Sequence, residues 1–254
     1  MLTDILLADG EHIEDLGGGV SLLVSKSHTF GTDALLLNYF ADVKKNDKAI
    51  DLGTGCGIIP FLWLRDNKAQ RYRGAAEIQQ NACEQFRKSQ KLNGDESLNL
   101  FEGDLKEKNL ISQREYFDVV TMNPPYKAEN SGIKNESESA KIARHETLCN
   151  IDDITLCAAR ILKFGGRLCI CHRPERTFDA LFSMRKNGIE PKKIRFVQKN
   201  GETAPWLVLI DGRKGGANGL KVEKPLLMQK TDGTPTDEIL EITEKYRKTY
   251  IKKH

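Results

Sequence analysis

The chain has 254 residues, of which 39% are hydrophobic and 30% are charged. This length allows one large domain or two small ones with a substantial core, and the composition excludes a mainly disordered chain. The longest apolar runs, Ile58 to Leu64 and Trp206 to Ile210, are far shorter than the roughly 20 residues that a bilayer requires. Since the N-terminus also carries acids where a signal peptide would be basic and then apolar, we expect a cytoplasmic protein with no membrane partner.

The net charge of +3 is divided unevenly along the chain. Residues 185–254 contain 16 Lys and Arg against 9 Asp and Glu, a balance of +7, while residues 1–184 contain 23 against 27, a balance of −4. A basic final third predicts contact with an anionic macromolecule. The alternative is a solvated, lysine-rich face without a partner.

Six cysteines occur without any Cys-x-x-Cys pair. They are too sparse for a disulfide framework, and their spacing does not fit a zinc site. The sequence therefore predicts free thiols in a reducing compartment and no bound metal.

The first predicted element is a hairpin, with two short extended segments around Gly17 to Gly19, the second being Val20–Val24. A helix follows it. Thr32 or Asp33 can serve as the N-cap of this helix, and its apolar side begins at Ala34.

From Ala49 onward, short β-like runs alternate with turns and helical stretches. The runs are Ala49–Leu52, Gly74–Ile78, Asn99–Glu102, Phe117–Met122, Gly166–His172, Ile194–Gln198 and Trp206–Asp211. One helical stretch, Gln79–Leu92, is ended by Asn93-Gly94. The alternation predicts an α/β fold with a doubly wound sheet of seven mostly parallel strands, which binds ligands beyond the carboxyl ends of those strands.

Two further segments lack this alternation. Lys127–Ser139 is polar and follows a strand, which is typical of a lid over a site or of a solvated connection. Near the C-terminus, Thr234 as N-cap and Pro235 as first residue predict the start of a helix. The expected parts of the chain are a hairpin extension at 1–30, a central domain at 31–216 and a C-terminal extension with a terminal helix at 217–254.

A glycine-rich turn, Gly53-Thr54-Gly55-Cys56-Gly57, follows the first of these runs. Glycines let the backbone turn sharply and approach a ligand where a Cβ would collide. Glu77 lies at the end of the second run, twenty residues beyond Gly57. A carboxylate at this place can accept hydrogen bonds from both hydroxyls of a ribose, so the pattern predicts a nucleotide-like ligand.

The glycine spacing and the nearby acids distinguish two kinds of nucleotide ligand. The spacing is Gly-x-Gly-x-Gly, whereas dinucleotide-binding folds use Gly-x-Gly-x-x-Gly. Asp51, just before the turn, would repel a pyrophosphate and suits a cation such as a sulfonium. Asp104, after the third run, can accept from the amino group of an adenine. The alternative is that these acids only cap helices.

The fourth run ends in Asn123-Pro124-Pro125-Tyr126. Each proline fixes φ at about −65° and biases the preceding residue towards an extended backbone, so the Pro124 carbonyl is held rigidly. With the Asn123 side chain it offers two acceptors, while Tyr126 offers a ring for stacking. The motif suits a planar substrate that carries an amino group.

These four motifs, in this order and at these strand ends, resemble the class I S-adenosylmethionine-dependent methyltransferases that modify amino groups. Three more segments narrow the resemblance to the bacterial methyltransferases that convert an adenine beside the anticodon of valine tRNA to N6-methyladenine. These segments are Phe30–Leu36, Ala143–Glu146 and Lys214–Gly216. The resemblance covers roughly residues 10–216.

The resemblance implies a Rossmann-like methyltransferase fold, S-adenosylmethionine as cofactor and an RNA substrate, tRNA near its anticodon. The implied cofactor-binding residues are Gly31, Thr32, Asp33, Asp51, Gly53, Gly55, Gly57, Glu77, Asp104 and Asn123. The implied catalytic residues are Asn123, Pro124 and Tyr126. Arg144 and His145 are expected to border the substrate entrance. The cations expected to hold RNA phosphates are Lys192, Lys193, Arg195 and Lys199.

The Asn-Pro-Pro-Tyr motif identifies an amino group and not the macromolecule that carries it. Enzymes that methylate a glutamine of translation release factors, an adenine of DNA or a guanine of ribosomal RNA use the same motif. A Rossmann oxidoreductase and a non-catalytic RNA-binding protein are two further alternatives. The glycine spacing disfavours the first, and the intact Asn123 and Tyr126 disfavour the second. The oligomeric state stays open.

Overall fold

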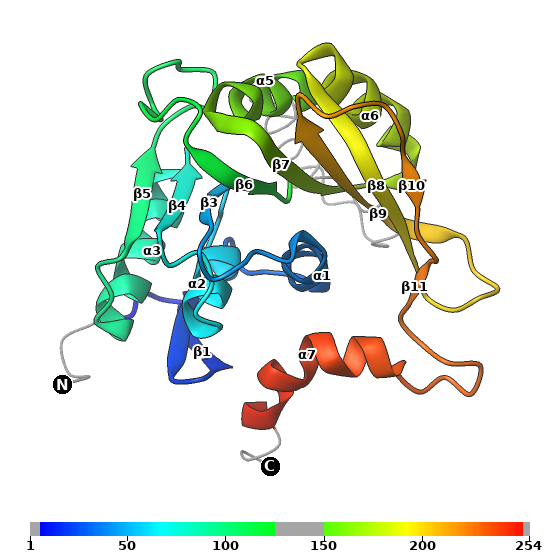
Figure 1. Ribbon diagram of the computed structural model, residues 1–254. Coiled ribbons are helices and arrows are strands. Elements are labelled where there is room, and N and C mark those ends of the chain that lie inside the picture. The colour runs from blue at the N-terminus through cyan, green and yellow to red at the C-terminus, as the bar shows by residue number, and fades with distance from the viewer. Residues whose placement is uncertain (1–5, 125–149, 251–254) are drawn as a thin grey trace, which may run out of the picture.

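The computed structural model describes residues 6–124 and 150–250, except for the side chains of 244–250 (Figure 1). The strands are β1 (His12–Gly17), β2 (Val20–Val24), β3 (Lys48–Leu52), β4 (Tyr72–Glu77), β5 (Leu98–Glu102), β6 (Phe117–Met122), β7 (Leu162–His172), β8 (Ile189–Gln198), β9 (Pro205–Lys214), β10 (Lys221–Val222) and β11 (Leu226–Leu227). The helices are α1 (Thr32–Ala41), α2 (Ile58–Arg65), α3 (Gln80–Asn93), α5 (Ile151–Ile161), α6 (Thr177–Lys186) and α7 (Asp237–Tyr250), with a 3₁₀ turn at Pro174–Arg176.

One large sheet organises the molecule, in the order β10-β8-β9-β7-β6-β3-β4-β5. Strands β3 to β7 are mutually parallel, and β9 runs antiparallel to both β7 and β8. This confirms the predicted α/β doubly wound sheet. The structure adds β10 and β11, which both pair with β8, to the seven predicted strands. Each has two residues, too few for a period-2 pattern to be recognised.

Helices cover both faces of the sheet (Figure 1). Helices α1, α2 and α3 pack on one face, and α5 and α6 pack on the other. Neighbouring strand residues therefore enter different cores: Ala49 and Val119 lie in the first, and Ile50 and Val120 in the second. Burial on both faces explains why these strands read as continuous apolar runs in the sequence.

The N-terminal hairpin forms as predicted, with β1 and β2 antiparallel. The predicted cap of α1 is wrong. Its N-cap is Gly31, which has an extended backbone and no capping side chain, while Thr32 is already helical. The Asp33 carboxylate accepts from the N–H of its neighbour Ala34 and lies inside the first turn. Helix α3 ends as predicted, at Gly94 with φ of 58°.

The terminal helix α7 begins at Asp237, two residues later than predicted from Pro235. Thr236 takes the capping role, since its hydroxyl accepts from the N–H of Ile239 at 3.3 Å. The predicted cap, Thr234, instead donates its hydroxyl hydrogen to Asp232. Helix α7 packs against β1 and α1 (Figure 1).

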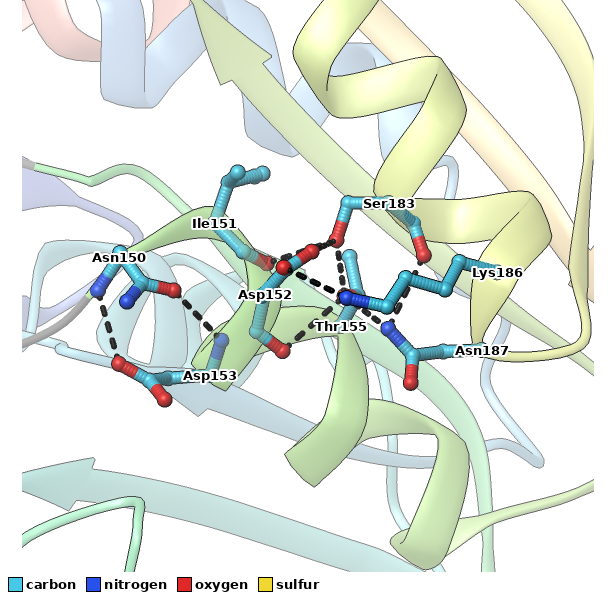
Figure 2. Close-up of polar contacts among 8 residues, drawn as sticks. All are labelled: Asn150, Ile151, Asp152, Asp153, Thr155, Ser183, Lys186 and Asn187. Carbon is cyan, nitrogen blue, oxygen red and sulfur yellow. Dashed lines mark hydrogen bonds and ion pairs between the residues drawn. The ribbon is translucent and has the colours of Figure 1, made fainter.

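A polar network joins the first turn of α5 to α6 (Figure 2). Asn150 and Asp153 form a reciprocal capping box at the start of α5. From α6, Lys186 Nζ contacts Asp152 at 3.0 Å, and the Ser183 and Thr155 hydroxyls share a hydrogen bond of 2.7 Å. The network fixes the start of α5 against α6.

No helix within residues 6–124 and 150–250 is both long and apolar enough to cross a bilayer. The five cysteines in these ranges are buried and free. The same ranges contain no cluster of three or more His, Cys, Asp and Glu side chains arranged to hold a metal ion.

Candidate active site

A cavity of about 420 Å³ opens beyond the carboxyl ends of β3, β4, β5 and β6. It contains seven of the site residues expected from the sequence. These are Asp33, Gly53, Gly55, Glu77, Asp104, Asn123 and Pro124. Four different strand ends and the first turn of α1 thus contribute to one site, as the sheet topology requires.

The glycine-rich turn forms one wall of the cavity. Gly53 and Gly55 line it with φ of 62° and 56°, a region that other residues adopt at a cost. A Cβ on Gly53 would lie 3.2 Å from the Met122 Cε, whereas a Cβ on Gly55 would meet nothing within 4 Å. The turn therefore leaves open space beside Gly55 for a ligand.

Gly57 does not line this cavity. It is the N-cap of α2 with φ of 89°, and a Cβ there would lie 2.5 Å from the Phe86 ring on α3. Gly31 and Thr32 also lie outside the lining, beside Asp33, which belongs to it. The third glycine of the motif is needed for close packing of α2 against α3.

The Glu77 carboxylate is fixed by three backbone donors. The Gly55 N–H donates to its Oε2 at 2.8 Å, and the N–H groups of Ile78 and Gln79 donate to its Oε1 at 2.9 and 2.8 Å. Because a carboxylate accepts about four hydrogen bonds, capacity remains for a ligand hydroxyl. Glu77 thus links the end of β4 to the glycine-rich turn and lines the cavity at the same time.

Asp51 is placed differently from the other acids. It is buried, it does not line the cavity, and its Oδ1 accepts from the Thr121 hydroxyl at 2.6 Å. Burial raises the pKa of this carboxyl to about 7, although the hydrogen bond from Thr121 opposes the shift. Asp51 is therefore buried next to the glycine-rich turn and cannot contact a ligand in the cavity directly.

Asp33 and Asp104 supply further acidic groups to the cavity. The Asp104 Oδ1 accepts from the N–H of Lys106 at 2.9 Å, which forms a tight turn after β5. Its Oδ2 lies 3.3 Å from the Lys106 ammonium. With Glu77, these carboxylates give the cavity the negative lining that a cationic adenosyl ligand requires.

Asn123 and Pro124 lie at the end of β6, on the cavity wall. The Asn123 Oδ1 accepts a hydrogen bond from the thiol of Cys171 on the neighbouring strand β7, at 3.0 Å. Tyr126, Arg144, His145 and the segment Lys127–Ser139 lie outside the described residues.

Several cavity residues are not among those assigned to the site from the sequence. They are Ser27, His28, Thr29, Cys56, Ala76, Ile78, Gln79, Gly103, Leu105 and Met122. The His28 Nε2 lies 3.2 Å from the Gln79 side-chain oxygen, which connects the segment before α1 to the end of β4. The signal available for most of them was their position beside a motif residue, such as Gln79 after Glu77.

Two of the cations expected to hold phosphates are already paired. Arg195 donates from both terminal nitrogens to the Glu238 carboxylate, at 2.6 and 2.7 Å. Lys193 Nζ lies 3.6 Å from Asp211 and above the Phe40 ring. The bidentate pair argues against Arg195 as a phosphate ligand. Lys193 shares the Asp211 carboxylate with Arg167, whose Nη1 lies 3.0 Å from the same oxygen.

The geometry fits a nucleoside with a positive charge, and the family comparison agrees. The model of the methyltransferase small domain family matches residues 23–186. The chain belongs to this family. It is an S-adenosylmethionine-dependent methyltransferase, and the cavity is suited to this cofactor by its open glycine turn and its carboxylates.

Curated relatives give a narrower comparison for this methyltransferase. A tRNA1(Val) (adenine(37)-N6)-methyltransferase of Phocaeicola vulgatus is 27% identical over 180 residues, 71% of this chain and 74% of the relative. The enzyme of the same name from Actinobacillus pleuropneumoniae is 23% identical over 217 residues, 85% of this chain and 88% of the relative.

Solved structures support the fold. A predicted O-methyltransferase from Agrobacterium tumefaciens has a TM-score of 0.67 at 19% identity, covering 84% of this chain and 96% of its own. TYW2 of M. jannaschii, in complex with AdoMet, has a TM-score of 0.54 at 13% identity, covering 82% and 88%. At these identities the likeness establishes a shared Rossmann-like methyltransferase fold.

Proposed function

We propose that this methyltransferase transfers a methyl group to the N6 amino group of an adenine in RNA, and that its substrate is tRNA near the anticodon. The observation that carries the proposal is the position of Asn123 and Pro124 in the same cavity as Glu77 and Asp104. The two curated relatives described above are named for adenine 37 of tRNA1(Val), which supports the choice of base and of RNA.

Each residue of the motif has a distinct role in this reaction. The Asn123 side-chain oxygen and the Pro124 carbonyl accept the two hydrogens of the adenine amino group and aim its lone pair. From its place in the motif, Tyr126 stacks on the base. S-adenosylmethionine, when bound, would supply a methyl group made electrophilic by its positive sulfur and would be left as S-adenosylhomocysteine with a neutral sulfur. The amino nitrogen loses one proton after the transfer. The adenine must leave its stack to enter the cavity, which costs less in a tRNA loop than in a duplex.

The cofactor is assigned to the residues that line the cavity. Glu77 binds the ribose through its remaining acceptor position, Asp104 accepts from the adenine amino group, and Asp33 faces the amino-acid part. Gly53 and Gly55 provide the close backbone approach. Asp51, Gly57, Gly31 and Thr32 support this arrangement from outside the lining. We place the reaction in the cytoplasm, where thiols such as the five described cysteines stay reduced.

The test is methyl transfer from labelled S-adenosylmethionine to total tRNA, ribosomal RNA, DNA and a release factor in separate reactions. We expect label in tRNA, recovered as N6-methyladenosine after digestion. Label found only in the release factor or only in DNA would overturn the RNA assignment. In parallel, Asn123→Ala should abolish transfer while calorimetry still detects S-adenosylhomocysteine binding.

A further inference from the structure

A second cavity, of about 580 Å³, lies beside the cofactor cavity. It is formed by the loop after β5 and by one side of α5, and we call it the α5 groove. Its lining residues are Leu105, Lys106, Lys108, Arg114, Asp153, Leu156, Cys157 and Arg160. Leu105 lines both cavities, so the groove adjoins the cofactor site.

The loop that carries these cations is held in place. Leu105 and Ile111 are buried in the core shared with α5. The N–H groups of Glu115 and Tyr116 donate to the carbonyls of Arg160 and Ile161, at 3.2 and 2.8 Å. These two backbone bonds bring Arg114 next to the C-terminal turn of α5. The cations of the groove therefore have fixed backbone positions before any partner binds.

Three of the four cations have no acidic partner. Lys106 pairs with Asp104, but across residues 6–124 and 150–250 no carboxylate forms an ion pair with Lys108, Arg114 or Arg160. This distinguishes them from Arg195, which Glu238 neutralises, and from Lys193, which lies 3.6 Å from an Asp211 oxygen shared with Arg167.

One hydrogen-bond donor of the Arg160 side chain lacks an acceptor among the described residues. Its Nε is buried and has no hydrogen-bond partner among the described residues, and its Nη2 contacts only the Cys157 sulfur, at 3.6 Å. The one acid of the groove, Asp153, accepts from the Asn150 N–H in the capping box. The groove thus combines unpaired donors with positive charge.

The remaining surface of the groove is apolar. Leu156 is 59% exposed in the middle of α5, although it is a large hydrophobic residue. An apolar floor with cations at its rim matches a ribonucleotide, which presents an anionic phosphate and the flat face of a base or sugar. An acidic peptide of polar residues alone would satisfy the cations but would leave Leu156 exposed.

We propose that the α5 groove binds the phosphates of the RNA strand that carries the target adenine, through Lys108, Arg114 and Arg160. The inference rests on the proposed function and adds to it the surface that holds the strand. It also replaces the sequence-based assignment of phosphates to Arg195.

The test compares two triple variants that lose the same charge. The first is Lys108→Gln, Arg114→Gln, Arg160→Gln. The control is Lys45→Gln, Lys91→Gln, Lys224→Gln, at exposed lysines outside the groove that are not assigned to phosphate binding. Total tRNA is titrated against each protein by fluorescence anisotropy at several salt concentrations, and S-adenosylhomocysteine affinity is measured as a check of the cofactor site.

We expect the groove variant to bind tRNA at least tenfold more weakly and its slope of log K against log salt to fall by about 2, for three lost contacts to a single strand. The control should shift little, and both should keep their cofactor affinity. Equal losses of tRNA affinity in the two variants, or no loss in the groove variant, would overturn the assignment of phosphates to the groove. The proposed function would still stand in that case, provided that the wild type methylates tRNA.

If the wild type instead methylates a release factor and no RNA, the proposed function itself fails, which the label transfer shows separately. If the triple variant does not fold, Lys108→Gln alone is used in its place, because Lys108 is exposed and its substitution should not disturb the fold. A single exposed substitution that lowers the salt slope supports the proposal, and one that leaves both slope and affinity unchanged counts against it.

Discussion

The thiol of Cys171 donates a hydrogen bond to the side-chain oxygen of Asn123 at 3.0 Å. Cys171 is fully buried in β7, and Asn123 lies on the cavity wall at the end of β6. The bond therefore connects the interior of the sheet to the residue proposed to hold the substrate amino group. It sets which side of the carboxamide faces β7, so Cys171 acts as a positioning residue for Asn123.

Replacing Cys171 with Ala should lower kcat for tRNA methylation roughly two- to tenfold, because a neutral hydrogen bond contributes about 0.5–1.5 kcal/mol. The affinity for S-adenosylhomocysteine should change little. Cys171→Ser, which keeps a donor, should recover much of the rate. Steady-state methylation with varied tRNA separates kcat from KM.

Cys169→Ala is the matched control for this variant. Cys169 is also fully buried in β7, two residues earlier, and forms no bond to Asn123. Equal reductions of kcat in the two Ala variants would show that loss of packing in β7, and not orientation of Asn123, explains the effect.

Glu77→Gln should weaken S-adenosylhomocysteine binding by roughly ten- to a hundredfold, as hydrogen bonds to a charged group contribute about 1.5–3 kcal/mol. The substitution also disturbs the three backbone hydrogen bonds to this carboxylate, one of which, from the Gly55 N–H, fixes the glycine-rich turn. Calorimetry measures the affinity directly. Glu84→Gln, at an exposed position of α3, is the control, and similar affinity for both variants contradicts the role of Glu77.

Gly57→Ala and Gly94→Ala should differ in their cost to stability. Both glycines have positive φ, which costs an alanine roughly 1–2 kcal/mol. Only at Gly57 would the new Cβ clash, 2.5 Å from the Phe86 ring, and overpacking adds about 1–3 kcal/mol. Urea unfolding should show the larger loss for Gly57→Ala. Equal losses would mean that α2 and α3 separate without cost.

Asp51 should make stability depend on pH. Burial raises its folded-state pKa to about 7 from an unfolded value near 3.8, so the folded protein binds the extra proton. Its contribution is fully present below pH 4 and is lost as pH rises to about 7, a change of up to about 4 kcal/mol. Asp51→Asn should flatten this slope in urea unfolding between pH 4.5 and 8. An unchanged slope would assign the pH dependence to other groups.

Much of the fold could be predicted because its signals are local. Strand Phe117–Met122 has the predicted bounds, since two prolines follow Asn123 and stop it. Gly94 ends α3 because glycine adopts the left-handed conformation there without strain. The acids Glu77 and Asp104 could be assigned to one site because parallel strands bring their carboxyl ends to the same edge.

The rest depends on contacts between distant parts of the chain. No local pattern connects Cys171 with Asn123, or Gly57 with the Phe86 ring that explains it. The pairing of Arg195 with Glu238 likewise required the position of α7. The distribution of charge along the sequence indicates a basic region. Only the structure distinguishes the cations that are paired with acids from those that can contact phosphates.

The contact between α7 and β1 bears on how the protein is made. On the ribosome the hairpin of β1 and β2 is synthesised before the large sheet, and α7 is synthesised after it. Part of the hairpin surface and part of α1 pack against α7, so neither is complete while the sheet strands are still being translated. Since the segment between that hairpin and α1 lines the cavity, we expect the nascent chain to complete this wall of the cavity only after α7 has been synthesised.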